Sequence, residues 1–486
     1  MASKLHHLNE LANVLSDKEK THEGVLAFYH QFKVSRLLSP FNAIKSKGYL
    51  VSTLILTLIM YRLRGASVWA MQKTGTLALF HGDENTIYRL MNNPLMNWRK
   101  LLMSFAKQFA VKVETKSVAT SVKSCFIVDD TDLEKTGKTM EFISRIHDHV
   151  AQKFPLGFKM LTLGFWEGKS LIAVDFSLHR EKRKDGTFGL SKKERSNQFH
   201  KKREKSLPSA MRVKELDEKK TEVAISMIKR AVKNGLVASY VLMDSWFTND
   251  YMIKSVRSIK NGAMHLLGMC KIDNRKYTYN CREMNAHQLI TRYERKKGKH
   301  SSKHKSHYIE LVVDYKGEKV KLFFVKYRNC KTWRCILSTH LTLKFTAAIE
   351  LYQIRWTIEV LFKECKQYLR LGTCQNTDFD GQIADTTIVL ITHTILMLQR
   401  RFEAYETMGG LFRESQQQLL ELTLWDRILK IFIRMLRELL EILSIDIEET
   451  IGKITSCDKS ATQVLAMLEA IKQSSDNAEY NPETAA

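Results

Sequence analysis

The sequence lacks the patterns of an exported or membrane-spanning protein. No apolar run is long enough to span a bilayer: residues 49–63 are too few, and residues 383–398 are interrupted by Asp385 and His393. The N-terminus shows no basic segment followed by an apolar core, so we expect no signal peptide. These absences predict a cytoplasmic protein that has no membrane partner.

Cysteine is also scarce, with eight residues in a chain of 486 and no C-x-x-C pair. This usage favours reduced thiols rather than a disulfide framework. Cys330 and Cys335 are too isolated to argue for a zinc site. No internal repeat or extended low-complexity segment is evident.

Acidic residues are few relative to basic ones, because 52 Asp and Glu face 77 Lys and Arg, for a net charge of +25. A field of this sign attracts polyanions and raises their encounter rate. Nucleic acid is the first candidate partner; a membrane surface would be the second, but the absence of a spanning run argues against it. The length allows a large core and two to four domains.

One stretch, residues 342–371, combines charge with helical spacing. Tyr352, Arg355, Glu359 and Lys366 are separated by 3, 4 and 7 residues, which places them within an arc of roughly 60° on one α-helix. The alternative is a solvated amphipathic helix whose Glu and Lys merely pair. We favour a functional face, because these charges border the apolar stripe, as they would at the lip of a cleft.

The same stretch is expected to form one uninterrupted helix. It contains no Gly or Pro, Thr342 is a plausible N-cap, and Gly372 is a plausible stop. Its apolar stripe is expected to pack on the protein and comprises Leu351, Ile354, Ile358, Leu361, Phe362, Cys365 and Leu369.

The middle of the chain predicts an α/β fold with a mixed sheet. Apolar runs alternate with helical segments in the order strand, strand, strand, helix, strand, helix, strand, which is the order of an RNase H-like domain. The expected elements are strands 124–128, 158–165 and 171–178, helix 209–234, strand 237–243, a helix capped by Thr248 or Asn249, and strand 263–270.

A β-rich insertion, residues 272–341, is expected to interrupt this domain before the 342–371 helix. Its strands are 308–315 and 319–326, joined at Lys316-Gly317, and 332–338. The domain therefore divides into 120–271 and 342–400. Two basic segments, 180–205 and 292–305, are either solvated loops or phosphate contacts.

The flanking regions, 1–119 and 401–486, are expected to be helical. Residues 67–80, a turn at His81-Gly82 and a helix capped by Asp83 outline a helix-turn-helix reader or a plain packing unit. The second of these helices would present Asn85, Tyr88, Arg89 and Asn92. Helix 388–398 is apolar enough for the core, and the amphipathic helix 419–443 serves core packing or a dimer contact.

Three carboxylates carry the expected chemistry. Asp130 and Asp244 each end an apolar strand, and Glu359 lies on the helix edge. Carboxylates brought together repel one another unless cations intervene, and hard oxygen ligands favour Mg²⁺ or Mn²⁺. Two such ions about 4 Å apart activate a water or a 3′-hydroxyl and stabilise the leaving oxygen of a phosphodiester.

The pattern Tyr352-x-x-Arg355-x-x-x-Glu359-x-x-x-x-x-x-Lys366 resembles the signature of bacterial DDE transposases of the insertion-sequence-4 family. Residues 128–131, Val-Asp-Asp-Thr, and residues 243–244, Met-Asp, resemble the other two carboxylate blocks of that family. The β-rich insertion before the Glu helix is also similar. The resemblance covers roughly residues 120–400, and the regions outside it carry no matching motif.

The resemblance implies a transposase that cuts element ends through a hairpin intermediate and joins the freed 3′-hydroxyls to target DNA. Its partners would be terminal inverted repeats and target DNA, bound by a homodimer in the bacterial cytoplasm near the nucleoid. The alternatives are an RNase H-like structure-specific nuclease and a non-enzymatic, domesticated DNA-binding protein.

The resemblance also implies a role for each residue. Asp130, Asp244 and Glu359 would be the catalytic and metal-binding acids; Asp129 is the alternative to Asp130, which is preferred because the family's catalytic Asp directly precedes Thr or Ser. Tyr352, Arg355 and Lys366 would hold phosphates near the scissile bond. Trp333 would stack on a flipped base or be a core residue of the insertion, and Trp356 would support the same site or simply pack.

Overall fold

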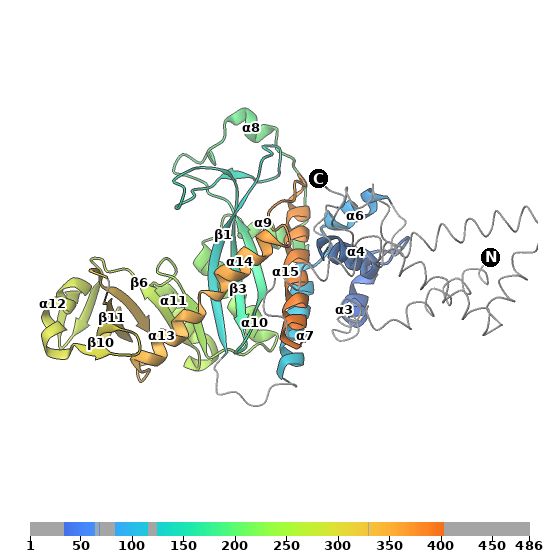
Figure 1. The fold of residues 1–486 in the computed structure, drawn as a ribbon. Helices are drawn as coiled ribbons and strands as arrows, with labels where there is room; N and C mark the ends of the chain where they lie inside the picture. The colour runs from blue at the N-terminus through green and yellow to red at the C-terminus, as the bar shows by residue number, and fades with distance from the viewer. Residues whose placement is uncertain (1–33, 64–67, 69–82, 115–123, 329, 403–486) are drawn as a thin grey trace, which may run out of the picture. The chain divides into compact units, whose positions relative to one another are not determined.

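The structure is a computed structural model that describes residues 34–63, 68, 83–114, 124–328 and 330–402 (Figure 1). All of them belong to one compact unit, Ala27–Gln416. The first helix and the turn of the expected helix-turn-helix lie almost entirely outside the described residues, as does the amphipathic helix 419–443.

One twelve-stranded sheet runs through the described residues. Its order is β2-β3-β1-β5-β6-β12-β11-β10-β7-β8, with β4 on β3 and β9 on β10. The strands are β1 (Cys125–Glu134), β2 (Ser144–Arg145), β3 (Leu156–Trp166), β4 (Leu171–His179), β5 (Tyr240–Met243), β6 (His265–Cys270), β7 (Lys276–Tyr279), β8 (Arg282–Asn285), β9 (Lys299–Ser301), β10 (Ser306–Tyr315), β11 (Glu318–Tyr327) and β12 (Arg334–Ser338).

The first part of this sheet is compatible with the expected RNase H-like fold. β1, β5 and β6 are parallel, β3 is antiparallel to β1, and β4 is antiparallel to β3. β3 and β4 are buried almost throughout, because helices pack against them; their apolar runs therefore show no alternation with polar residues.

Helices cover the sheet and form the N-terminal part of the described chain (Figure 1). They are α3 (Val34–Leu38), η2 (Ser39–Ile44), α4 (Val51–Leu63), α6 (Glu84–Met91), α7 (Trp98–Glu114), α8 (Lys192–Ser196), α9 (Pro208–Glu215), α10 (Lys220–Lys233), α11 (Asp250–Ser258), η3 (Ile259–Gly262), α12 (Ala286–Lys297), α13 (Phe345–Ile354), α14 (Thr357–Gln367) and α15 (Phe379–Phe402).

The expected single helix 209–234 is wrong, because it is divided into α9 and α10. The chain leaves the helix after Glu215, where Asp217 turns to form two hydrogen bonds with the guanidinium of Arg180. A new helix then begins at Lys220.

The expected single helix 342–371 is also wrong. α13 ends at Ile354 and α14 begins at Thr357, and Lys344 rather than Thr342 is the N-cap. Across the junction, the N–H groups of Arg355, Trp356 and Glu359 each donate to the carbonyl three residues earlier. This tighter 3₁₀-type turn is a common mark of a hinge or a functional site inside a helix.

The block 272–341 contains the expected strands. The β10–β11 hairpin turns at Lys316-Gly317, both with positive φ, as a type I′ two-residue loop requires. β12 pairs with β6, so these strands continue the same sheet instead of forming a separate one. The domain boundaries themselves stay a prediction.

α15 is the core helix that the sequence predicts around residues 388–398. Among the described helices it alone is long and apolar enough to cross a membrane, but its apolar window, residues 379–398, is fully buried inside the protein. It packs against α4, α6 and α7.

α6 begins after its expected cap, Asp83. Asn92, which the sequence predicts on the presented face of this helix, instead accepts a hydrogen bond from Asn376 within the protein.

Candidate functional site

A pocket of about 470 Å³ opens where β5 ends, beside the middle of β1. β1 continues to Glu134, so the expectation that Asp130 ends its strand is wrong. The three expected acids come from three different elements: β1, the loop after β5, and α14. The structure brings them to this one pocket, which is lined by Asp129, Asp130, Thr131, Asp244, Arg355, Glu359, Phe362, Lys363 and Lys366.

Arg355 lies between two of the acids. Its Nη1 donates to Asp129 at 2.7 Å and its Nη2 donates to Glu359 at 2.6 Å. The side chains of Arg355 and Asp129 are each only 14% exposed, so the contact is shielded from solvent. The guanidinium therefore acts as a local counter-charge for two carboxylates from different elements.

Asp129 and Asp130 face different partners, because consecutive strand residues point to opposite sides of a sheet. Asp129 meets Arg355, whereas Asp130 forms an ion pair with Lys220, the first residue of α10. Burial raises the pKa of Asp129 to about 7; Arg355 opposes this rise and Asp244 adds to it. Asp129 thus lies with Asp244, Arg355 and Glu359.

Asp244 is fixed by its own loop. Its Oδ1 accepts the backbone N–H of Trp246 at 3.0 Å and that of Phe247 at 3.2 Å, and the Thr248 hydroxyl donates to its carbonyl at 2.7 Å. Gly268 on the neighbouring strand makes this close approach possible, because a Cβ there would collide with the Thr248 hydroxyl. The loop after β5 therefore presents Asp244 in one defined orientation.

Lys366 approaches the pocket from the far end of α14. Its Nζ donates to the Thr131 hydroxyl at 2.9 Å, and burial lowers its pKa. Three of the four residues of the helical signature, Arg355, Glu359 and Lys366, therefore line the pocket despite the break between α13 and α14.

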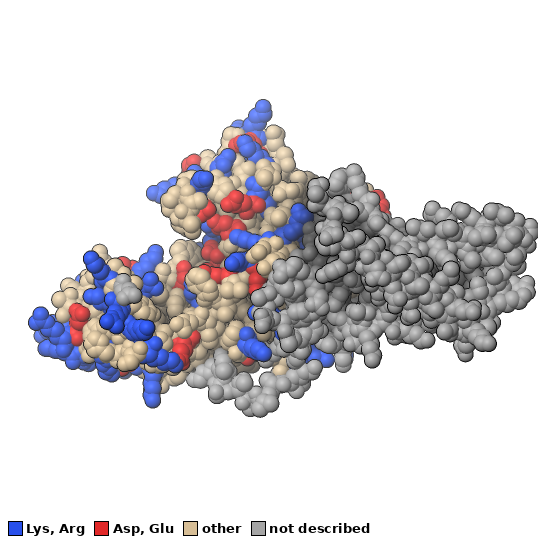
Figure 2. All heavy atoms as spheres, viewed as in Figure 1, with Lys and Arg blue, Asp and Glu red and all other residues tan. Residues whose placement is uncertain are grey.

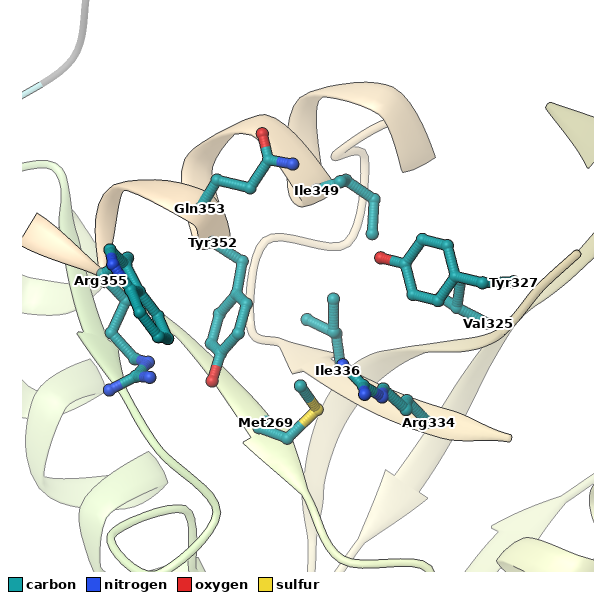
Figure 3. A pocket seen from close by; sticks show the side chains of 10 residues that line it. Met269, Val325, Tyr327, Arg334, Ile336, Ile349, Tyr352, Gln353 and Arg355 are labelled. Atoms are coloured by element: carbon teal, nitrogen blue, oxygen red, sulfur yellow. The ribbon is translucent and has the colours of Figure 1, made fainter. Parts of the chain in front are cut away.

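Tyr352, the fourth, lies beside Arg355 in an adjoining pocket of about 410 Å³. Figure 3 shows its ring pointing from α13 toward Met269, with the Arg355 guanidinium alongside. Burial raises the pKa of Tyr352 to about 12, so its hydroxyl stays protonated at neutral pH and can donate. The pocket is lined by Met269, Val325, Tyr327, Arg334, Ile336, Ile349, Tyr352, Gln353, Arg355 and Trp356.

Trp333 does not line either pocket. It immediately precedes β12, its ring meets that of His307 with centroids 5.6 Å apart, and Lys326 Nζ lies 5.9 Å from its centroid. Trp356, next to Arg355, does line the pocket that contains Tyr352 (the aromatic pocket) and is 62% exposed. The structure therefore places Trp356, rather than Trp333, in the pocket that adjoins the acids through Arg355.

The lining offers carboxylate oxygens, which are the ligands that hard divalent cations prefer. Within the described ranges, no three His, Cys, Asp or Glu side chains are already grouped as a metal site. Lys220 and Arg355 instead hold Asp130 and Asp129. The carboxylate oxygens are the type of ligand that Mg²⁺ or Mn²⁺ prefers. To bind them, a cation would take the place of the Arg355 and Lys220 side chains that now contact Asp129 and Asp130.

Basic side chains gather in two places on the face shown in Figure 2, over α8 and over the α12 end of the sheet. Part of the 180–205 segment is used internally: Lys201 pairs with Asp378 and Asp380, and Arg203 with Glu141. The exposed remainder is Lys182, Arg183, Lys184, Lys192, Lys193, Lys202 and Lys205.

Sequence reasoning missed two neighbours of the acids, Lys220 and Trp246. Lys220 falls inside the expected helix 209–234, and Trp246 follows the expected strand 237–243 without belonging to a motif. The sequence does contain a signal for Trp246. An Asp that follows a strand commonly accepts the backbone N–H two residues later, which holds the residue there in a tight turn.

Comparison with known families agrees with this geometry. Residues 51–261 match a family described as DDE superfamily endonuclease, and residues 204–395 match one described as Transposase DDE domain. No curated protein matches the chain. Together the family matches support a DDE transposase, that is, an enzyme that acts on DNA and cleaves nucleic acid, of a type that generally uses divalent metal ions.

Proposed function

We propose that this DDE-type enzyme is a DNA transposase similar to those of the insertion-sequence-4 family, which cuts the ends of its element and joins them to target DNA. The observation that supports this most directly is the convergence of Asp129, Asp244 and Glu359 on one pocket around Arg355. The charge of +25 suits a DNA substrate.

We assign the metal-binding role to Asp129, Asp244 and Glu359, with Asp129 in place of Asp130. Arg355 pairs with both Asp129 and Glu359, and the nearby Asp244 helps to raise the pKa of Asp129, whereas Asp130 pairs with Lys220. Two bound Mg²⁺ or Mn²⁺ ions would supply an activated water or 3′-hydroxyl and stabilise the leaving oxygen.

The cations of the helical signature hold the DNA backbone. Arg355 presents a fork of donors that suits two oxygens of one phosphate, and Lys366 adds a point charge at the other end of α14. The Tyr352 hydroxyl, protonated at neutral pH, can donate to a third oxygen. These groups orient the scissile phosphate against the acids without moving protons themselves.

The hairpin route requires a base to leave the duplex. We propose the aromatic pocket beside Arg355 for that base, because Tyr352 and Trp356 offer stacking surfaces there. Trp333 could bind that base only if it moves toward the pocket when DNA binds.

We further propose that the substrates are terminal inverted repeats and target DNA, and that the protein is a homodimer in the DNA complex. Residues 1–119 would recognise the repeats, and residues 401–486 would form the dimer contact.

The proposal is tested with the full-length chain and the DNA that flanks its gene. Cleavage at a defined end, followed by joining of a pre-cut end to a second DNA, supports a transposase. Cutting without joining identifies a structure-specific nuclease instead, and binding without cutting identifies a non-enzymatic DNA-binding protein.

Removing divalent ions with EDTA should abolish cleavage, and adding Mg²⁺ or Mn²⁺ should restore it. We expect DNA binding, measured by fluorescence anisotropy at fixed ionic strength, to persist in EDTA, because the basic surface supplies it. The ions should also raise the melting temperature of the DNA-free protein, since they bind carboxylates that only the folded protein brings together. Full cleavage in EDTA would contradict the assigned chemistry.

Replacing Arg355 by Ala should lower end cleavage on the order of 10²-fold, as for loss of a transition-state donor, and DNA affinity far less. Arg355→Lys should remain defective, since it keeps the charge but loses the fork. Lys229→Ala, which removes an exposed charge from α10, is the matched control. Equal losses of binding and cleavage in Arg355→Ala would reject a local role.

A further inference from the structure

Trp246 is an exposed indole close to the pocket that contains Asp129, Asp244 and Glu359 (the acid-lined pocket), although it is not one of the lining residues. It lies two residues after Asp244, and 52% of its surface is accessible. Within the part of the chain that the structure describes, only Trp246 and Trp356 are exposed tryptophans, and Trp356 already lines the aromatic pocket. No role assigned above uses Trp246.

The exposure of Trp246 does not come from a loose loop. Its backbone N–H is held by Asp244 Oδ1 at 3.0 Å. Its ring meets the edge of Phe247, with centroids 4.7 Å apart and planes at 76°, and Phe247 is buried. The fold therefore holds a large apolar surface in water beside Asp244, where burial would have been favourable.

A cation accompanies the indole. Lys220 Nζ lies 5.3 Å from the Trp246 ring centroid and forms an ion pair with Asp130. Asp130 and Asp129 point to opposite sides of β1, so this pair lies across the strand from Arg355 and the aromatic pocket. Arg355, which lines both pockets, connects the acid-lined pocket to Tyr352 and Trp356. Asp130, which also lines it, connects it through Lys220 to Trp246.

We propose that Trp246 and Lys220 form a stacking platform for an unpaired base of the DNA strand that enters the acid-lined pocket. Every base has a π-face that an indole can stack on, and a lysine beside the ring can bind the adjoining phosphate. The platform rests on the proposed function. It adds a second base-binding position, on the side of the scissile phosphate opposite the Tyr352 pocket.

The test compares two labelled duplexes, one fully paired and one with three unpaired nucleotides at an end, bound to the full-length protein in fluorescence anisotropy. Trp246→Ala should weaken binding to the splayed duplex about tenfold and leave binding to the paired duplex nearly unchanged. Trp246→Phe should retain most of the affinity, because it still stacks. Tyr251→Ala, which removes another exposed aromatic residue nearby on α11, should change neither.

A second readout reports stacking directly. 2-Aminopurine at the unpaired position should be quenched by the wild-type protein and by Trp246→Phe, and not by Trp246→Ala. Equal affinity of wild type and Trp246→Ala for the splayed duplex would overturn the platform, as would a Trp246→Ala effect on self-association alone. If the wild type cuts DNA while Trp246→Ala binds normally, only the platform fails; if the wild type neither binds nor cuts DNA, the proposed function fails with it.

Discussion

Asp129→Asn is expected to reduce DNA cleavage on the order of 10³-fold or more, whereas Asp130→Asn should retain substantial activity. The two acids are adjacent in β1, yet only Asp129 shares Arg355 with Glu359. Amidation removes the charge of a proposed metal ligand at Asp129, whereas at Asp130 it removes only an ion pair with Lys220. Both variants are isosteric, so each serves as the control for the other.

The measurement is plasmid cleavage in Mg²⁺, with DNA affinity and melting temperature recorded for both variants. DNA affinity should stay close to wild type or rise slightly, because each change removes a negative charge from the proposed phosphate-binding site. An inactive Asp130→Asn beside an active Asp129→Asn would restore the assignment that adjacency to Thr131 favours.

Asp175→Asn is expected to cost about 3–5 kcal/mol of folding stability, as breaking a buried ion pair does. Asp175 on β4 is fully buried and contacts Arg99 of α7 at 3.0 Å and Arg230 of α10 at 2.8 Å, with Arg212 of α9 at 3.6 Å. It therefore ties three helices to one strand, and its loss leaves the three guanidinium groups with Glu215 as their shared carboxylate partner in this cluster. Denaturant unfolding followed by circular dichroism measures the change.

The pH dependence has a defined sign. Burial alone would raise the pKa of Asp175, but Arg99, Arg230 and Arg212 outweigh it and hold the pKa at about 2. Because this lies below the unfolded value of about 3.9, the stabilisation is complete above that pH and is lost as the pH falls from about 4 toward 2. Asp175→Asn should lack this acid-dependent loss.

The control is Asp217→Asn, which removes a carboxylate from Arg180 at a site where the Asp side chain is 47% exposed. A surface pair of this kind contributes about 0–1 kcal/mol, so its loss should shift the unfolding midpoint little. Comparable destabilisation by the two variants would show that burial does not set the strength of the Asp175 cluster.

Much of the fold follows from local sequence. The apolar runs of β1, β3, β4, β5 and β6 predicted the mixed sheet, and Lys316-Gly317 predicted the β10–β11 hairpin, because buried strands and tight turns have strong local signals. The joining of β12 to β6 was not predictable. That pairing depends on contacts between residues far apart in the sequence, and no local pattern encodes it.

The site was only partly predictable for the same reason. Spacing grouped Arg355, Glu359 and Lys366 correctly at one pocket, although the chain tightens into a 3₁₀ turn at Arg355 that helical periodicity does not reveal. The choice between Asp129 and Asp130 depends on which face of β1 meets α14, and alternation alone does not orient a strand that is covered on both sides.

The β12–β6 pairing also bears on any attempt to trim this protein. In a five-stranded core, β6 would be an outer strand whose backbone N–H and C=O groups lack partners on one side. Here β12 pairs with that side of β6, and its residues Cys335, Ile336, Leu337 and Ser338 are in register with Cys270, Met269, Gly268 and Leu267. Excising residues 272–341 to obtain a minimal catalytic fragment would uncover a largely buried apolar strand and favour edge-to-edge aggregation, so a soluble fragment should keep β12 in place.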